Sequence, residues 1–257
     1  MTNMTILFWI ISTCIAGGFL SLLFAFLFFK KANINIVTNM VSLSVGTMLG
    51  AVFLEILPHA LEQSIDSHDT MFIVLIGLLI FFILEKLLIW RHCHGDHCET
   101  HSHDTLLKHN KSGSLLLIGD LSHNFIDGIL IASAFIYEFQ LGLVTALAIY
   151  AHQIPQEMGN ISIFVHKGLK KSKAILLNVI ANITMTIGAV ITYILIDSAG
   201  EILPVLLAFT ASNLIYVAIS DLIPGLHKRT EIKESTMQIA MILIGVMIVY
   251  FFHTFLH

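Results

Sequence analysis

Polar side chains interrupt two long apolar runs near the middle of the sequence, at spacings that place them on one helical face in each run. In the first run, positions i, i+3, i+4 and i+7 are Asp120, His123, Asn124 and Asp127. In the second run, one-turn spacing relates His152, Gln156 and Asn160, with Gln153 beside them. Residues three and four apart share a face of a helix. Each run therefore predicts a helix with a polar stripe.

The two stripes face each other if the runs form an antiparallel hairpin that turns near residues 137–141. Because both helices rise equally, this hairpin brings Asp127 level with His152, and His123 level with Pro155. Two imidazoles and a carboxylate in one small volume suit a borderline divalent cation, with amide oxygens completing the shell. A lone histidine on an apolar face is usually a satisfied core residue, but more polar groups converge here than structural hydrogen bonding needs. The pattern predicts a buried metal site.

The composition indicates what kind of chain holds this site. Of 257 residues, 56% are hydrophobic and 12% are charged, and the mean hydropathy is +0.87. These values are typical of a polytopic membrane protein. Apolar runs long enough to span a bilayer cover residues 5–29, 37–61, 71–90, 114–137, 141–165, 174–196, 202–223 and 236–256. We expect eight transmembrane helices in a single all-α domain over residues 1–257.

The placement of charge predicts the orientation in the membrane. All 13 Lys and Arg lie at run ends or in four connections, whereas the alternate connections around Asp66, Glu138 and Asp197 hold none. By the positive-inside rule the basic connections are cytoplasmic, so both termini lie outside. We expect a multi-pass integral protein of the plasma or inner membrane, with its first run retained as a helix. Cys93 and Cys98 then lie on the reducing side, so no structural disulfide is expected.

Further polar residues extend the predicted site towards both membrane surfaces. Towards the outside, the end of the second run carries Glu55 and His59, one turn apart. An unpaired carboxylate as deep as Glu55 costs a few kcal/mol, which favours a functional role for it. Towards the inside, similar depth is shared by Asp120, Asn160 and Asp221. We interpret the first group as an entrance and the second as an exit.

The connection over residues 91–113 is rich in histidine and has no apolar periodicity. Its candidate ligands are His92, His94, His97, His101 and His103. Imidazole and thiolate are favoured Zn²⁺ ligands, but the spacing matches no closed zinc-finger pattern. The loop reads as a cytoplasmic metal-collecting segment, with an ordinary polar linker as the alternative.

Other polar residues within the runs have more ordinary interpretations. Pro155 should kink its helix, and Glu157 lies about 140° around that helix from His152, outside the metal shell. For Asn182, with Asn178 and Thr184, interhelical hydrogen bonds are favoured over metal ligation. His253, near the outer end of the last run, reads as an interfacial residue.

The motifs His123-Asn-Phe-Ile-Asp127-Gly and His152-Gln-Ile-Pro-Gln156-Glu resemble the paired motifs of the ZIP (Zrt/Irt-like) divalent metal transporters. The eight helices, the histidine-rich loop and the segment Tyr216-Val-Ala-Ile-Ser-Asp221-Leu-Ile-Pro agree with that family. The resemblance implies helices 4 and 5 sandwiched between two inverted three-helix repeats. It also implies transport of Zn²⁺, and sometimes Fe²⁺, Mn²⁺ or Cd²⁺, into the cytosol.

Carried over by position, the family's primary metal site falls on His123, Asp127, His152 and Gln156. A second site would use Asn124 and Gln153 together with the shared Asp127. This sequence departs from the family at both glutamines, because Gln153 replaces an acidic residue and Gln156 replaces a histidine or glutamate ligand. A neutral amide oxygen is the weaker ligand, so we expect one metal ion, bound more weakly.

Other functions compete with metal transport. An intramembrane zinc-dependent hydrolase would need a general base near the metal, where this chain has Gln153. A metal-sensing receptor would need an output domain. The expected partners are divalent metal ions and the lipid bilayer, with no catalytic cofactor and no nucleic acid; a homodimer is left open.

The orientation can be tested apart from the function. In a Cys-free background, a cysteine placed beside Glu138 should react with an impermeant thiol reagent added to intact cells. A cysteine beside Lys170 should react only after the membrane is opened, because charge placement puts that connection inside. The reverse labelling pattern would contradict the assignment of entrance and exit together.

Overall fold

The computed structural model describes residues 3–29, 34–62, 66–90, 112–166, 168–196, 202–228 and 231–256, and these ranges are helical apart from short turns. Among the described residues, six passes are single helices: α1 (Asn3–Phe29), α4 (Ser67–Trp90), α5 (Ser112–Tyr137), α6 (Phe139–His166), α7 (Lys171–Ile196) and the last pass, α10 (Ile232–Leu256). The all-helical polytopic architecture predicted from the sequence is confirmed. Several helices begin a few residues before the apolar runs, and α5 includes the last two residues of the predicted loop.

Two passes change their helical form part-way through. The second pass is α2 (Ile34–Ala51), the π-helical segment η1 (Val52–Ile56) and α3 (Leu57–Glu62). The seventh is α8 (Leu203–Tyr216), the π-helical η4 (Val217–Leu222) and α9 (Ile223–His227). In each, a proline follows an acidic residue by three positions, as in Glu55-Ile-Leu-Pro58 and Asp221-Leu-Ile-Pro224. Proline lacks an N–H group, so it interrupts the α-helical ladder, and π-helical turns accommodate the interruption.

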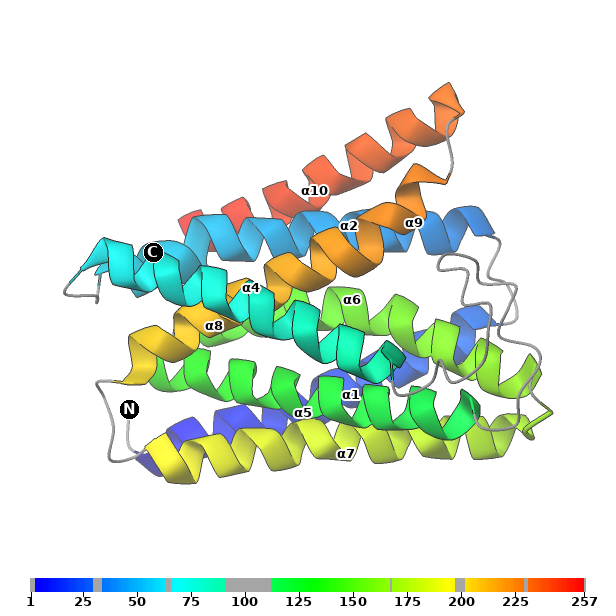
Figure 1. Ribbon diagram of the computed structural model, residues 1–257, viewed down its shortest axis with the longest axis horizontal. Coiled ribbons are helices and arrows are strands. Elements are labelled where there is room, and N and C mark those ends of the chain that lie inside the picture. The colour runs from blue at the N-terminus through cyan, green and yellow to red at the C-terminus, as the bar shows by residue number, and fades with distance from the viewer. Residues whose placement is uncertain are drawn as a thin grey trace.

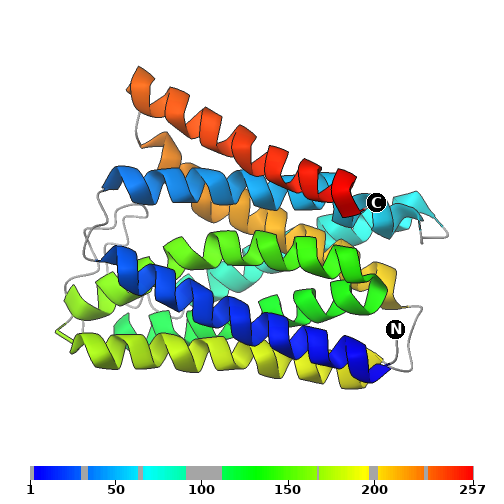
Figure 2. The ribbon, with the colours of Figure 1, turned by 180° about the vertical axis from the view of Figure 1, so that it is seen from behind.

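The helices form two groups. In one, α1, α5, α6 and α7 pack together; in the other, α2 packs on α10 and α4 packs on α8. The contact of α6 with α2 joins the groups, and both chain ends lie at the same end of the bundle (Figures 1 and 2). Helices α5 and α6 thus lie between passes from the first and the last third of the chain.

Glycine allows close packing inside each group. A methyl group at Gly128 of α5 would collide with the carbonyl oxygen of Met185, and one at Gly188 of α7 with that of Phe125. Because hydrocarbon solvent supplies no hydrophobic drive between helices, membrane bundles rely on such backbone approach. The tight α5–α7 pair fixes the helix that carries His123 and Asp127.

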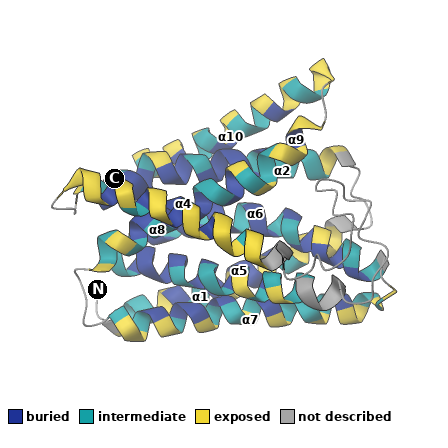
Figure 3. Cartoon of the chain, in the orientation of Figure 1, coloured by how far each residue is buried: buried dark blue, intermediate teal, exposed yellow. Residues whose placement is uncertain are grey.

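Helix α6 is less apolar than the other passes. Seven of the passes are long and apolar enough to span a membrane by composition, but α6 does not meet that criterion although it has 28 residues. Its polar stripe lowers its hydropathy, and neighbouring helices enclose it: within residues 139–165 only Gly159 is exposed (Figure 3). A helix covered by protein needs no apolar face for lipid, so the bundle can hold a polar helix at its centre.

Candidate metal site

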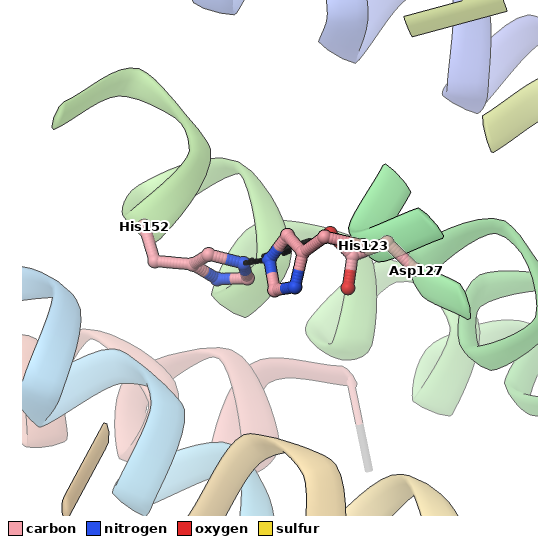
Figure 4. A group of neighbouring side chains, drawn as sticks. All are labelled: His123, Asp127 and His152. Carbon is pink, nitrogen blue, oxygen red and sulfur yellow. Dashed lines mark hydrogen bonds and ion pairs between the residues drawn. The ribbon is translucent and has the colours of Figure 1, made fainter. Parts of the chain in front are cut away.

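Three metal-ligating side chains converge where α5 faces α6. The Nε2 atoms of His123 and His152 lie 3.2 Å apart, and Asp127 Oδ2 lies 3.5 Å from the first and 3.6 Å from the second (Figure 4). The three candidate ligand atoms lie within 4.8 Å of one another. The hairpin register expected from the sequence thus agrees with the structure.

The tautomer of His152 follows from its neighbours. Its Nδ1 lies 3.2 Å from the carbonyl oxygen of Ala148, one turn earlier on α6. A carbonyl only accepts hydrogen bonds, so Nδ1 carries the proton and the Nε2 lone pair of the neutral ring points at His123 and Asp127. Donation from the second ring nitrogen to a backbone carbonyl is the usual way in which proteins orient a metal-ligating histidine.

Asp127 is the most deeply buried member of the group. Its side chain is 0% exposed, and among the described residues neither carboxylate oxygen has a hydrogen-bond partner. A buried carboxylate without donors is costly unless a positive charge lies beside it. With two imidazole nitrogens in reach, its oxygens fit a divalent cation held at this point.

Pro155 interrupts the hydrogen-bond ladder of α6 just beyond His152, and the helix continues through it. Because Pro155 has no N–H group, the carbonyl of Ala151 loses its partner one turn later. The hydroxyl of Ser44, fully buried on α2, donates to that carbonyl. Ser44 thus stabilises α6 beside His152 and links the two groups of helices at the level of the candidate site.

Gln156 lies one turn beyond His152 on the inner side. Its amide nitrogen donates to Asp120 Oδ1 over 3.2 Å. This bond orients the side chain within the cavity that also exposes His123 and His152. The carbonyl oxygen of Gln156 is then the atom that could complete a metal shell.

The residues of the predicted second site bond to one another. The amide nitrogen of Gln153 donates to Asn124 Oδ1 over 2.9 Å and to Asn182 Oδ1 over 2.6 Å. Asn182 in turn donates to Glu157 Oε1 over 2.8 Å, and Ser21 donates to the same oxygen. The network runs from α5 through α6 to α7 and α1. The amide nitrogen of Gln153 thus occupies the oxygens of Asn124 and Asn182, while its own amide oxygen has no hydrogen-bond partner among the described residues.

The polar residues that we expected to lie outside the metal shell differ in their hydrogen bonds. Interhelical hydrogen bonding is confirmed for Asn182, whereas Thr184 Oγ1 lies 2.9 Å from the Leu121 carbonyl oxygen and 2.6 Å from that of Ala181 in its own helix. Asn178 donates instead within its own helix, to Ala174. Glu157 lies away from the three-ligand group, as expected, because its hydrogen-bond partners are on α1 and α7.

A cavity of about 580 Å³ connects the site with the end of the bundle that carries the basic connections. Its lining includes the predicted exit residues Asp120, Asn160 and Asp221, together with His123, His152 and Gln156. On the other side of the site, Leu130, Ile131 and Ala148 are buried in the apolar core. The described site is therefore open towards the predicted cytoplasmic end and covered towards the outer end.

Glu85 of α4 is a cavity residue that the sequence analysis did not identify. It lines the same cavity as Asp221, and the hydroxyl of Tyr216 donates to its carboxylate. In the sequence, Glu85 is a carboxylate five residues before the end of an apolar run. Such a position is typical of an ordinary interfacial residue, so it did not indicate a cavity residue. Its orientation towards the cavity depends on the packing of α4 against α8.

The predicted entrance residues occupy the opposite end. Glu55 is 1% exposed, and His253 Nδ1 of α10 lies 2.8 Å from its Oε1 atom. His59 Nε2 lies 3.2 Å from Glu138 Oε2, in the turn between α5 and α6. His253 therefore has a buried acidic partner that its position near the chain end did not reveal. The loop histidines His92, His94, His97, His101 and His103 lie outside the described residues.

The sequence was compared with known protein families and with known proteins. Residues 89–253, more than half of the chain, match the family described as ZIP zinc transporter. The chain belongs to the ZIP zinc transporter family. It is 27% identical to Zinc transporter YKE4 of Saccharomyces cerevisiae over 80% of this chain and 68% of that protein. It is 26% identical to Zinc transporter ZIP13 of Pongo abelii, over 84% of this chain and 67% of that protein.

A shorter match is 32% identical to Zinc transporter zipt-7.2 of Caenorhabditis elegans, over 53% of this chain and 30% of that protein. Membership of the ZIP family makes this chain a membrane metal transporter and not an enzyme, so the hydrolase alternative is set aside. The family match includes α5 and α6, which carry the three converging ligands.

The amide network gives a prediction for the second site. Gln153→Glu replaces a double donor by a carboxylate that faces two amide oxygens and lies one turn from Glu157. We expect a loss of about 3 kcal/mol in the free energy of unfolding in chelator, because a buried charge loses its partners, with partial recovery in excess Zn²⁺. Thermal unfolding in detergent measures both effects. The half-buried Gln140→Glu on the same helix is the control, and an unchanged Gln153→Glu unfolding temperature in chelator would contradict the network.

Proposed function

We propose that this ZIP protein moves Zn²⁺ across the membrane into the cytosol through a single site made by His123, Asp127 and His152, with Gln156 as the fourth ligand. The observation that carries the proposal is the convergence of three ligand atoms within 4.8 Å in the core of the bundle. Two imidazoles and one carboxylate form a ligand set typical of Zn²⁺. The names of the relatives, all zinc transporters, support the same cargo.

The number of ions follows from the two glutamines. Gln156 offers a neutral oxygen and Gln153 donates both of its amide hydrogens to other amides. With neutral amides at both positions, the site beside Asp127 carries less negative charge than it would with acidic residues there, which disfavours a second dication. We therefore propose one ion per transport event, bound more weakly than in relatives with acidic or histidine ligands at these positions. The same types of ligand also bind Fe²⁺, Mn²⁺ and Cd²⁺, so these ions are further candidate cargo.

The route uses residues at three depths. Glu55 and His59 attract the cation at the outer end, and the buried site strips part of its hydration. The carboxylates of Asp120 and Asp221, with the amide of Asn160, line the cavity through which the ion leaves. Among the described residues these exit carboxylates form no three-ligand cluster like that of the buried site, which favours release, because conduction needs sites that an ion can leave. We assign the histidine loop, residues 91–113, the role of collecting released metal on the cytoplasmic side.

Uptake by reconstituted liposomes tests the site. His123→Ala or Asp127→Ala should abolish Zn²⁺ uptake, because each removes a strong ligand from a low-dielectric site with few substitutes. Gln156→His should lower the half-saturating Zn²⁺ concentration about tenfold, which corresponds to ~1.4 kcal/mol, with an equal or reduced maximal rate.

The matched controls are His68→Ala and Asp69→Ala, two exposed residues at the start of α4. Both should transport like the unaltered protein. Full transport by folded His123→Ala or Asp127→Ala protein would exclude the proposed site. Running Fe²⁺, Mn²⁺ and Cd²⁺ in the same assay ranks the cargo.

A further inference from the structure

Four ionisable side chains meet at the outer end, well away from the buried ligands. Glu55 lies on η1, His59 on α3, Glu138 in the turn between α5 and α6, and His253 on α10. They form two close pairs, His59 Nε2 with Glu138 Oε2 at 3.2 Å and His253 Nδ1 with Glu55 Oε1 at 2.8 Å. The second imidazole nitrogen of His59 lies 4.0 Å from Glu55 Oε2, so the pairs adjoin.

His59 repeats the arrangement of His152 in the buried site. Its Nδ1 lies 2.7 Å from the backbone carbonyl of Glu55, one turn earlier, just as His152 Nδ1 contacts Ala148. The carbonyl requires a proton on Nδ1, which leaves the Nε2 lone pair of a neutral ring directed at a carboxylate in both places. Two lone pairs that face each other at 3.2 Å repel unless a proton or a metal ion lies between them.

We propose that His59 and Glu138 form a second divalent-cation site at the outer end, which binds a borderline ion such as Zn²⁺ before it reaches the buried ligands. The assignment as a stage of transport rests on the proposed function, but the binding site does not. Glu55 positions His59 through its carbonyl, and His253 holds the Glu55 side chain from α10.

The exposure of these ligands sets the strength of the site. The side chain of His59 is 14% exposed and that of Glu138 is 32% exposed, compared with 1% and 0% for His152 and Asp127. With two protein ligands and solvent access, the ion keeps part of its water shell. We expect binding at least tenfold weaker than at the buried site, which suits capture followed by release.

The ligands also come from different parts of the bundle. His59 belongs to the group that contains α2 and α4, whereas Glu138 connects α5 to α6 in the other group. An ion between them therefore bridges the two groups at the outer end. On the inner side the groups are separated by the cavity instead.

Cobalt provides the test, because Co²⁺ takes zinc ligands and its visible spectrum changes when imidazole and carboxylate replace bound water. The background variant of the full chain has alanine at His123 and His152, with serine at the loop residues His92, Cys93, His94, His97, Cys98, His101, His103 and His109. This background should still bind one Co²⁺ per chain. Adding His59→Ala should abolish the change in the visible spectrum, and adding Glu138→Gln should weaken binding at least tenfold.

Adding His68→Ala to the background should change nothing, since that histidine is exposed and is not one of the proposed ligands. Circular dichroism and gel filtration confirm that each variant is folded. No Co²⁺ binding by the folded background, or binding unaffected by both His59→Ala and Glu138→Gln, would overturn the proposal and leave a plain imidazolium–carboxylate pair. Because the background lacks the buried ligands, its result does not depend on whether the buried site transports metal.

Discussion

The structure depends on holding the negative charge of Asp127 in the interior of a membrane bundle. An ionised carboxylate there costs several kcal/mol unless a cation or donors surround it. The bundle provides two imidazoles and no hydrogen-bond donor among the described residues. A divalent ion at this point would balance that charge, which is the physical reason for proposing that the metal binds here.

The arrangement of the helices follows from that requirement. Helix α6 carries too many polar residues to face lipid, so α1, α2, α5 and α7 cover it. Gly128 and Gly188 bring α5 and α7 close together, and Ser44 satisfies the carbonyl that Pro155 leaves without a partner. The polar stripe is thereby protected from lipid, while the cavity keeps its inner end accessible.

Much of this arrangement could be predicted from the sequence because the signals are periodic or compositional. Apolar runs indicated the passes, and the one-turn spacing of His123 and Asp127, opposite His152, indicated the buried ligand group. The orientation of Glu85 and the pairing of His253 with Glu55 could not be predicted, since both depend on contacts between helices far apart in sequence. The amide network around Gln153 was also hidden, because spacing does not tell which amide atom faces which neighbour.

The π-helical segments were missed although a local signal existed. Glu55-x-x-Pro58 and Asp221-x-x-Pro224 share one pattern, the first near the outer end and the second near the inner end. Each acidic residue lies in a π-helical turn just before its proline. This correspondence between the second and seventh passes is what inverted repeats would produce, and it places one carboxylate at each end of the proposed route.

Zinc K-edge X-ray absorption can identify the atoms that hold the ion. The sample is purified protein with its loop histidines and cysteines replaced by serine, loaded with one equivalent of Zn²⁺. We predict a shell of nitrogen and oxygen at about 2.0–2.2 Å, with scattering from two imidazoles that falls to one in His152→Ala. A shell of oxygen alone, or two imidazoles that persist in His152→Ala, would show that the ion is held elsewhere and would contradict the account.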